Sequence, residues 1–335
     1  MADTLKILVC NDSNITQEGI IKLKLYKLDA SYTKINSVNH MSDTLKILYC
    51  VRCKIDQQGI SDCNLKELYC LDNSKIKSVN HMKNSLEILD CSMDSINQDG
   101  ISQLTNLKSL CINGNNKINN LNHLNKLESL ICVNSNTINN KSISKLKLKE
   151  LCVSNNNIYN LDNMCESLKV LLCASNLKIT QDTISKLNLI ILDASGCPQI
   201  YDVSHMNNLK ILSCPGKSGI YQNKINNLNL IELNAYDNKY INNISALSEL
   251  KILHCGGQCK IKENHTLNHN LKYINYYYKF HVDDKEKKSY EYGHDFIQVI
   301  FLNYIKVCTM ITQKICIFFI NIIDLMKKMV DNCIH

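Results

Sequence analysis

Arginine is almost absent from the sequence: Arg52 is the only one among the 335 residues, although the formal net charge is +7. Proteins that read base edges or clamp phosphates usually do so with arginine, whose planar guanidinium binds as a bidentate fork. The positive charge here comes from lysine. Lysine, asparagine, isoleucine and tyrosine all have A/T-rich codons, so part of their excess reflects the genome. We therefore expect no nucleic-acid partner.

Recognisable catalytic motifs are missing as well. The sequence contains no glycine-rich phosphate loop, no HExxH pair and no GxSxG serine. We therefore expect no enzymatic activity and no cofactor. The stretch from Phe296 to about Val330 is strongly apolar, but Lys306, Lys314 and Asp324 interrupt it. The charge-free runs fall short of the roughly 20 residues that a membrane-spanning helix needs.

The first residues, MADTLKIL, lack the basic start, apolar stretch and cleavage site of a secretory signal. Most of the 18 cysteines recur at one place in a repeat, which is typical of a small buried apolar residue and not of a disulfide framework. Free thiols fit a reducing compartment. We therefore expect an intracellular, cytoplasmic protein.

What the sequence has in abundance is one six-residue phrase. LKILYC begins at Leu45, and close variants begin at Leu5, Leu65, Leu86, Leu127, Leu168, Leu209 and Leu250, with degenerate ones at Leu25, Leu107, Leu148, Leu189, Leu230 and Leu271. The starts are 20 or 21 residues apart, and a short fixed period is the signature of a solenoid. We number the copies from 1 at Leu5 to 14 at Leu271, and count positions from the first leucine of each copy.

Within a copy, positions 1, 4 and 6 are apolar, position 9 is polar, and an isoleucine stands at position 11 or 12. In copy 3 these are Leu45, Leu48, Cys50, Cys53 and Ile55. Alternation at positions 4 and 6 predicts a strand of about four residues. The period is too short to add a long helix, so a turn and a short return should follow. Stacked in register, such strands form one parallel sheet with neighbours about 4.8 Å apart.

This pattern resembles the leucine-rich repeat family, whose consensus is LxxLxLxxNxL, with cysteine commonly in place of the third leucine. The resemblance covers Leu5 to about Tyr276. It implies an α/β-type repeat solenoid, a right-handed superhelical horseshoe of about 13 or 14 repeats. A curved parallel sheet would line the concave side, and short 3-10 or irregular returns would form the convex side.

In that family the position-9 asparagine bonds to the backbone of the turn and forms a ladder from repeat to repeat. The residues that match it are Asn73, Asn115, Asn156, Asn176 and Asn238. Lys217 and Gln258 replace the asparagine in copies 11 and 13, so the ladder is in doubt near the C-terminal end.

The second halves of the copies alternate between two types. Odd copies continue as ITQEGI at Ile15 or INQDGI at Ile96, whereas even copies continue as INSVNHM at Ile35 or IKSVNHM at Ile76. The even type resembles the returns of phosphatase-regulator and internalin-like repeats. The odd type is similar to the helix starts of cysteine-containing and ribonuclease-inhibitor-like repeats. Duplication of a two-copy unit of about 41 residues explains the alternation.

Cysteine occupies position 6 of every odd copy, and a histidine recurs in the NHM, NHL or SHM motif of copies 2, 4, 6 and 10. Equivalent residues in such copies lie two strands apart, about 10 Å, too far for a disulfide or a shared zinc ion. We interpret the cysteines as core residues. The CxxC at Cys50 and Cys53 leaves zinc as the weaker alternative. We interpret the histidines, His40, His81, His123 and His205, as capping or turn residues on the convex edge.

The outward positions of the strands carry the functional hypothesis. Position 2 is usually lysine and should form a rail along one margin of the sheet, while positions 3, 5 and 7 are unexpectedly apolar. A contiguous exposed apolar strip usually marks an interaction surface, although isoleucine and tyrosine also favour strands for their own sake. We predict a protein-binding concave face formed by Lys46, Ile47, Tyr49, Lys66, Tyr69, Leu71, Ile88, Lys108, Ile131, Val133, Lys149, Lys169, Leu172, Lys210 and Lys251.

The ends of the chain differ from the repeat. We assign residues 1–276 to the solenoid, 277–295 to a charged and aromatic connection, and 296–335 to an amphipathic helical segment. The last repeat of a solenoid needs a cap, so we favour a capping role for that segment, with docking on a partner or membrane surface as the alternative. The strand of copy 1 should have an open edge, where self-association is expected.

Taken together, these features predict a non-catalytic scaffold or adaptor that binds a protein partner. One alternative is a substrate-recognition subunit of an enzyme complex, such as a ubiquitin-ligase adaptor or a phosphatase regulator. The F-box-like helical module expected of ligase adaptors does not precede the repeats. Another alternative is an adaptor docked on a membrane surface through the C-terminal helix. A ligase cysteine would have to be Cys308, Cys316 or Cys333, in a segment too short for such a domain.

Overall fold

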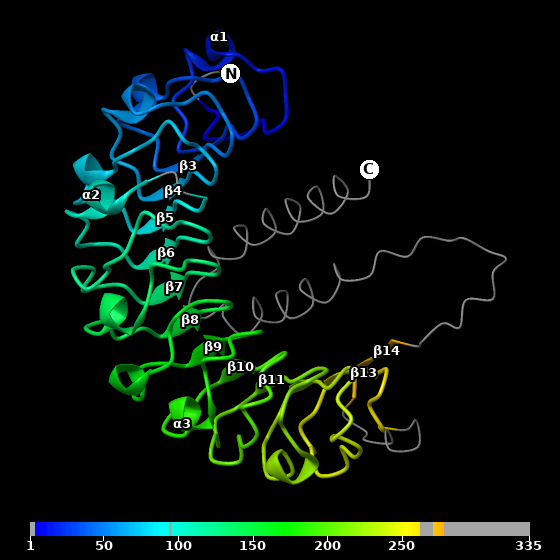
Figure 1. Ribbon diagram of the computed structural model, residues 1–335. Coiled ribbons are helices and arrows are strands. Elements are labelled where there is room, and N and C mark those ends of the chain that lie inside the picture. The colour runs from blue at the N-terminus through cyan, green and yellow to red at the C-terminus, as the bar shows by residue number, and fades with distance from the viewer. Residues whose placement is uncertain (1–3, 94–95, 262–270, 278–335) are drawn as a thin grey trace, which may run out of the picture. The chain divides into compact units, whose positions relative to one another are not determined.

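The computed structural model describes residues 4–93, 96–261 and 271–277. In them fourteen strands form a single parallel sheet, and each strand pairs with those of the neighbouring copies (Figure 1). The strands are β1 Ile7–Val9, β2 Lys27–Asp29, β3 Ile47–Tyr49, β4 Glu67–Tyr69, β5 Ile88–Asp90, β6 Ser109–Cys111, β7 Ser129–Ile131, β8 Glu150–Cys152, β9 Val170–Leu172, β10 Ile191–Asp193, β11 Ile211–Ser213, β12 Glu232–Asn234, β13 Ile252–Gly256 and β14 Tyr273–Tyr277. The predicted parallel sheet with one strand per copy is confirmed.

Equal positions of successive copies lie side by side in this sheet. Leu48 at position 4 pairs with Leu28 on one side and Leu68 on the other. The strands from β1 to β12 cover only positions 3 to 5, one residue less than predicted. The hydrophobic period, repeated without slippage, therefore determines the register of the whole sheet.

Position 8 explains why the strands are so short. In copies 1 to 13 this residue has a left-handed backbone, with φ between 47° and 64°. Glycine adopts this conformation without strain and asparagine at small cost, and four copies use glycine there, Gly216 among them. Tyr32, Arg52 and Met93 adopt it as well. The reversal of φ turns the chain out of the sheet two residues after position 6.

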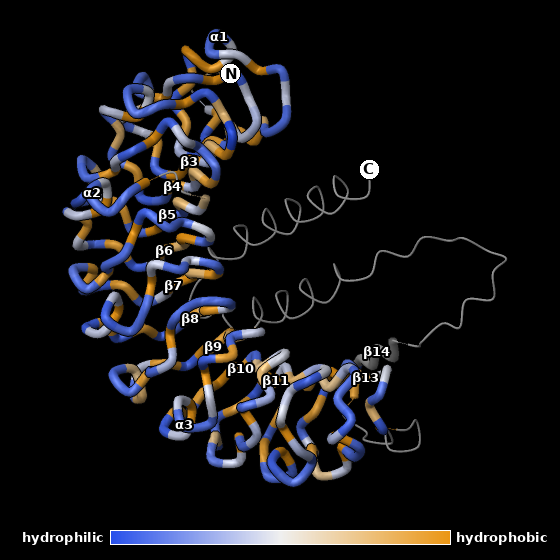
Figure 2. Tube along the Cα trace, in the orientation of Figure 1, coloured by the Kyte–Doolittle hydropathy of each residue, from blue (hydrophilic) through white to orange (hydrophobic). Residues whose placement is uncertain are grey.

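The core is one continuous cluster that runs from Cys10 to Ile261. Positions 1, 4 and 6 point into it: Leu45, Leu48 and Cys50 are each 0% exposed. In Figure 2 hydrophobic residues recur in every coil, and hydrophilic residues prevail in the outer loops. Each copy buries its apolar side chains only against its neighbours, which is how solenoids are stabilised.

The returns are short, as predicted. They contain single helical turns, α1 Gln17–Ile20, α2 Gln98–Ile101 and α3 Gln181–Ile184, and 3-10 turns, η1 Asn39–Met41, η2 Gln58–Ile60, η3 Asn80–Met82, η4 Asn140–Ile143, η5 Asp162–Met164 and η6 Gln222–Lys224. All three α-helical turns belong to odd copies. The QEGI and QDGI sequences thus form helix starts that end after one turn.

The two return types interlock, which explains their alternation. In copy 5 the Gln98 amide accepts from the backbone of Asn119 and Asn120 in copy 6 and donates to the Asn120 carbonyl. In the opposite direction, His123 Nε2 of copy 6 lies 3.0 Å from the Ile101 carbonyl oxygen. His40, His81 and His205 make the same contact with the preceding odd copy. The predicted capping role of these histidines is confirmed.

The described part of the chain also shows how the array begins. Among its strands, β1 pairs on one side only, with β2. Ile7 and Val9 of β1 are 55% and 60% exposed. Self-association through this edge stays a prediction.

The chain divides into two compact units, Met1–Lys279 and Phe280–His335, and all the described residues belong to the first. No helix among them has the length and hydrophobicity to cross a bilayer. The predicted C-terminal helical segment, 296–335, and the connection, apart from its first residue, lie outside the described residues.

Candidate interaction surface

The residues on either side of the inward leucine form the second face of the sheet. In β3, Ile47 and Tyr49 flank Leu48, and only Leu48 belongs to the core cluster. Period-two alternation therefore places positions 3 and 5 on the face away from the core. This face lines the inner side of the curved sheet, opposite α1, α2 and α3 (Figure 1). It contains the predicted partner-binding residues of the strands.

An aromatic stack stands out on this face. The rings of Tyr49 and Tyr69, which pair across β3 and β4, lie parallel with centroids 4.2 Å apart. The Lys27 ammonium lies 5.2 Å from the centroid of Tyr49, and the Tyr69 hydroxyl donates to Glu67 Oε2 at 3.1 Å. Burial raises the pKa of Tyr49 to about 12, so its hydroxyl is neutral at physiological pH.

The predicted apolar strip is less exposed than its composition suggests. Tyr49, Tyr69, Leu71 and Ile131 are buried, with 3%, 2%, 6% and 7% of their surface exposed. The half-buried members are Ile47, Ile88, Val133 and Leu172. The expectation of a fully exposed strip is therefore wrong for the first four. Strands about 4.8 Å apart bring side chains of the same row into contact, so each covers its neighbours.

The lysine rail is present and is divided by two glutamates. Lys46, Lys66, Lys169, Lys210 and Lys251 are exposed or half-buried at position 2. In the middle of the rail, Lys108 and Lys149 form salt bridges of 2.9 and 2.8 Å with the position-2 glutamates of the preceding copies. Such exposed pairs contribute little to stability, but they cancel the charge locally. Lys46 and Lys66, in the copies that carry the tyrosine stack, take part in no salt bridge among the described residues.

Polar side chains that the sequence reasoning missed lie in the same rows. In copy 5 the Ser92 hydroxyl donates to Asp90 Oδ1 at 2.6 Å and lies 3.3 Å from Cys111 Sγ. Burial raises the pKa of the Asp90 carboxyl to about 6, and the hydrogen bonds from Ser92 oppose that rise. The protonated fraction of Asp90 therefore changes most steeply around pH 6.

A longer polar row crosses β10 to β12. The Ser195 hydroxyl donates to Asp193 and lies 3.1 Å from the Ser213 hydroxyl, which accepts from the Asn234 amide at 3.2 Å. The signal for these networks is a recurrent LDxS motif, at Leu28, Leu89 and Leu192, whose aspartate accepts from the serine backbone. The concave face thus combines apolar, basic and hydrogen-bonding sections.

The cysteines at position 6 lie in the core, as interpreted from the sequence. Cys50, Cys91 and Cys173 are each 0% exposed, and burial raises the pKa of the Cys91 thiol well above its ordinary value. Cys53 and Cys197 instead occupy position 9, where each makes hydrogen bonds with the turn backbone. In the described residues no group of three or more potential ligands surrounds a metal position.

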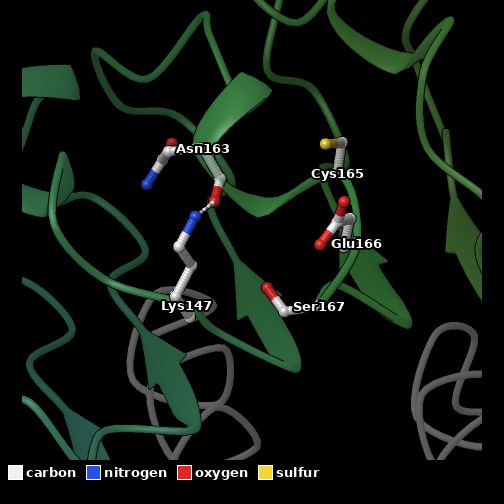
Figure 3. Close-up of a pocket in the computed structure, with 5 residues that line it drawn as sticks. All are labelled: Lys147, Asn163, Cys165, Glu166 and Ser167. Atoms are coloured by element: carbon white, nitrogen blue, oxygen red, sulfur yellow. Dashed lines mark hydrogen bonds between the residues drawn. The ribbon is translucent and has the colours of Figure 1, made fainter.

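A hollow on the outer surface has, among the described residues that line it, no free cationic group with which to bind a ligand. It is lined by Lys147, Asn163, Cys165, Glu166 and Ser167 (Figure 3). The Lys147 ammonium donates to the Asn163 carbonyl at 2.7 Å, and Lys24 makes the same contact with the His40 carbonyl in copies 1 and 2. The contact is thus a repeated structural link between copies, and it occupies the only cationic group of the hollow.

The predicted asparagine ladder runs through the interior. Asn115 donates to the carbonyls of Cys91 and Ile96 in the preceding copy, both at 2.9 Å. The other members, Asn73, Asn156, Asn176 and Asn238, each donate to the position-6 carbonyl of the preceding copy. One strand per copy, leucines that point into the core and this ladder are the features of the leucine-rich-repeat architecture. The chain has the leucine-rich-repeat fold.

The ladder is interrupted where the sequence departs from the consensus. Lys217 is exposed, and the buried hydroxyl of Ser218, one residue later, has no hydrogen-bond partner among the described residues. Gln258 is exposed too, and the Cys259 thiol contacts the Ile241 carbonyl instead, at 3.6 Å. The predicted weakness of the ladder in copies 11 and 13 is confirmed.

Solved leucine-rich-repeat structures are similar at low identity. An internalin, InlF from Listeria monocytogenes, aligns over 85% of this chain and 88% of its own, with 18% identity and a TM-score of 0.47. The functional domain of InlJ from that species, which includes a cysteine ladder, aligns over 75% of this chain and 63% of its own, with 23% identity and a TM-score of 0.49. A chain of the yeast Rad7–Elc1 complex aligns over 82% of this chain and 81% of its own, with 16% identity and a TM-score of 0.44. The sequence matches no family model and no curated protein.

Proposed function

We propose that this protein is a non-catalytic scaffold or adaptor that binds another protein on its concave face. The observation that carries the proposal is the Tyr49–Tyr69 stack on the concave face, which lies outside the core cluster, with the Lys27 ammonium 5.2 Å from the centroid of the Tyr49 ring. Tyrosine is enriched among the residues that dominate interface energies. The stack forms a rigid support, and the half-buried Ile47 and Ile88 in the same rows offer contact area.

The rest of the face supports binding better than catalysis. Asp90 and Asp193 are bonded to the serines of their own turns, an arrangement that orders the surface. The position-6 thiols of the core have raised pKa values, as at Cys91, so they are poor nucleophiles. Because such thiols persist in reducing surroundings, we further propose a cytoplasmic location.

Replacing the aromatic anchor should abolish partner capture. In the variant Tyr49→Ser/Tyr69→Ser/Leu71→Ser we expect the partner recovered from native cells to fall at least about tenfold, because interface anchors often contribute 2 kcal/mol or more each. Affinity capture with quantitative mass spectrometry measures this. Ser213 already occupies the same row as the tyrosines, so serine is compatible with the sheet.

A second variant controls for the loss of apolar surface. Ile21→Ser/Met93→Ser removes side chains that are 49% and 45% exposed away from the strand rows, and it should capture the partner as wild type does. Circular dichroism melts would verify that both variants fold. Equal recovery with the folded anchor variant and wild type would refute binding through this stack.

A further inference from the structure

A second set of aromatic side chains lies outside the concave face. Tyr159, Tyr201 and Tyr221 each directly follow the recurrent flank isoleucine, in copies 8, 10 and 11. They are 59%, 49% and 45% exposed, whereas Ile158, Ile200 and Ile220 before them are completely buried. Together with Tyr240 of copy 12 we name these residues the tyrosine flank. They lie in the segment that follows the turn after each strand, on one side of the solenoid.

Two members of the tyrosine flank are in contact, and the backbone of the other two is fixed by neighbouring copies. The rings of Tyr221 and Tyr240, from neighbouring copies, have centroids 4.5 Å apart at an angle of 47°. The backbone of Tyr201 is held by the side chain of Gln181, and the Tyr159 carbonyl accepts from the Thr183 hydroxyl. Leu177, on the turn between Tyr159 and Tyr201, is 60% exposed. The aromatic rings thus project from a backbone that is fixed by the copy-to-copy bonds.

The rest of the array provides an internal comparison. In copies 1 to 7 the same place is always polar, with Thr16, Asn36, Asp56, Lys77, Asn97, Asn119 and Asn139. Copy 9 has Thr180 at this place, and tyrosine stands there in copies 8, 10 and 11. Codon bias acts on all copies alike and does not explain why tyrosine is absent from this place in copies 1 to 7. Exposed apolar patches mark interaction sites, and tyrosine supplies contact area at a low cost in conformational entropy.

The charge around the tyrosine flank is positive. The turns that lead into it carry exposed lysines at Lys178, Lys217, Lys239 and Lys260, and the Lys239 ammonium lies 5.0 Å from the centroid of Tyr240. Two of the nearby carboxylates are engaged: Asp202 forms a 2.7 Å salt bridge with Lys224, and Asp237 accepts from the backbone of Gln258, whereas Asp182 of α3 is exposed. The surface is therefore complementary to a chain of negative charge.

We propose that the tyrosine flank binds an extended acidic segment of another protein that contains proline. From copy 8 to copy 12 the strands advance by about 5 Å per copy, so the flank spans about 20 Å. An extended polyproline segment rises 3.1 Å per residue and would cover it with roughly seven residues. Proline rings pack on exposed aromatic side chains in known recognition modes, and glutamates between them would reach the lysines. No arginine stands among the residues of copies 8 to 12, and this favours a peptide over nucleic acid.

A synthetic peptide tests this assignment on the full-length protein. The probe is a fluorescein-labelled peptide of about twelve residues in which glutamate and proline alternate, and the measurement is fluorescence anisotropy at low and high salt. We expect saturable binding that weakens with salt. The variant Tyr159→Asn/Tyr201→Asn/Tyr221→Asn should bind at least about tenfold more weakly. Asparagine already stands at this place in copies 6 and 7, so the fold should be retained.

Three comparisons make the result decisive. A lysine–proline peptide of equal length should not bind, and the Tyr49→Ser/Tyr69→Ser/Leu71→Ser variant should bind the acidic peptide as wild type does, because the concave face is a separate surface. A single-stranded RNA of similar span should bind more weakly than the acidic peptide. The proposal is overturned by no binding of the acidic peptide, by equal binding to the asparagine variant, or by tighter binding of the RNA.

Discussion

Replacing Leu151 by alanine is expected to lower the free energy of unfolding by about 3 kcal/mol or more. Leu151 occupies position 4 in β8, at the middle of the sheet, and is 1% exposed within the core cluster. Its strand pairs with β7 and β9, so the cavity would open between two copies that cannot collapse onto it. Urea denaturation followed by circular dichroism measures the change.

The matched control is the same substitution at the end of the array. Leu8 holds position 4 in β1, is only partly buried, and has a neighbouring strand on one side among the described residues. We expect Leu8→Ala to cost about 1 kcal/mol, since less contact is lost. Equal losses at Leu8 and Leu151 would contradict a core built by stacking, because stacking makes inner copies depend on two neighbours.

Replacing Asn115 by leucine should be similarly damaging, although leucine has nearly the same volume. The Asn115 side chain is 0% exposed, donates to the carbonyls of Cys91 and Ile96, and accepts from the backbone of Lys117. Leucine would leave these three backbone groups buried without a partner. At 1–3 kcal/mol for each such group, we expect a loss of about 4 kcal/mol, measured by the same denaturation.

Two further variants separate the ladder from the residue type. Asn119→Leu alters an exposed asparagine four residues away and should change stability by less than about 0.5 kcal/mol. Asn115→Ser should fall between wild type and Asn115→Leu, because Ser135 fills the same place in copy 7 and donates to the Ile112 carbonyl at 2.6 Å. If Asn115→Leu were as stable as wild type, the ladder would not be a source of stability.

The fold could be predicted from the sequence because the same constraint is repeated in every copy. Leu48 and Cys50 could be predicted as core residues because their apolar positions alternate with neighbouring positions along the strand and recur in every copy of about 20 residues. Both therefore lie on the face of the sheet that is buried. The ladder at Asn73 followed from the family resemblance, and its weakness at Lys217 followed from the departure from asparagine at the same position. A departure from the pattern in one copy does not obscure the prediction, because the other copies repeat it.

The surface was harder to predict, for physical reasons. The burial of Tyr49 depends on Lys27 and Tyr69, which are about 20 residues away along the chain but adjacent in the sheet. The Asp90–Ser92 network places charge in rows expected to be apolar, and only comparison of the LDxS motifs would have found it. Side-chain contacts between copies depend on which residues face each other, and the period alone does not specify them.

The tyrosine flank escaped prediction for a different reason. Tyr201 and Tyr221 stand just after the recurrent isoleucine, at a place that the consensus leaves unspecified. Their meaning appears only when the copies are aligned and exposure is known. The positions that are the same in every copy are easy to interpret as structural. Function is expected at positions where single copies differ from the others.

Lysine acylation of the captured complex tests the central claim most directly. When the partner is bound, we expect the rail lysines Lys46 and Lys66 to lose reactivity towards an acylating reagent. Lys22 and Lys83, which are exposed on the returns, should react as in the free protein. Peptide mass spectrometry measures both sets in one sample. Rail lysines that stay fully reactive in an intact complex would contradict binding on the concave face.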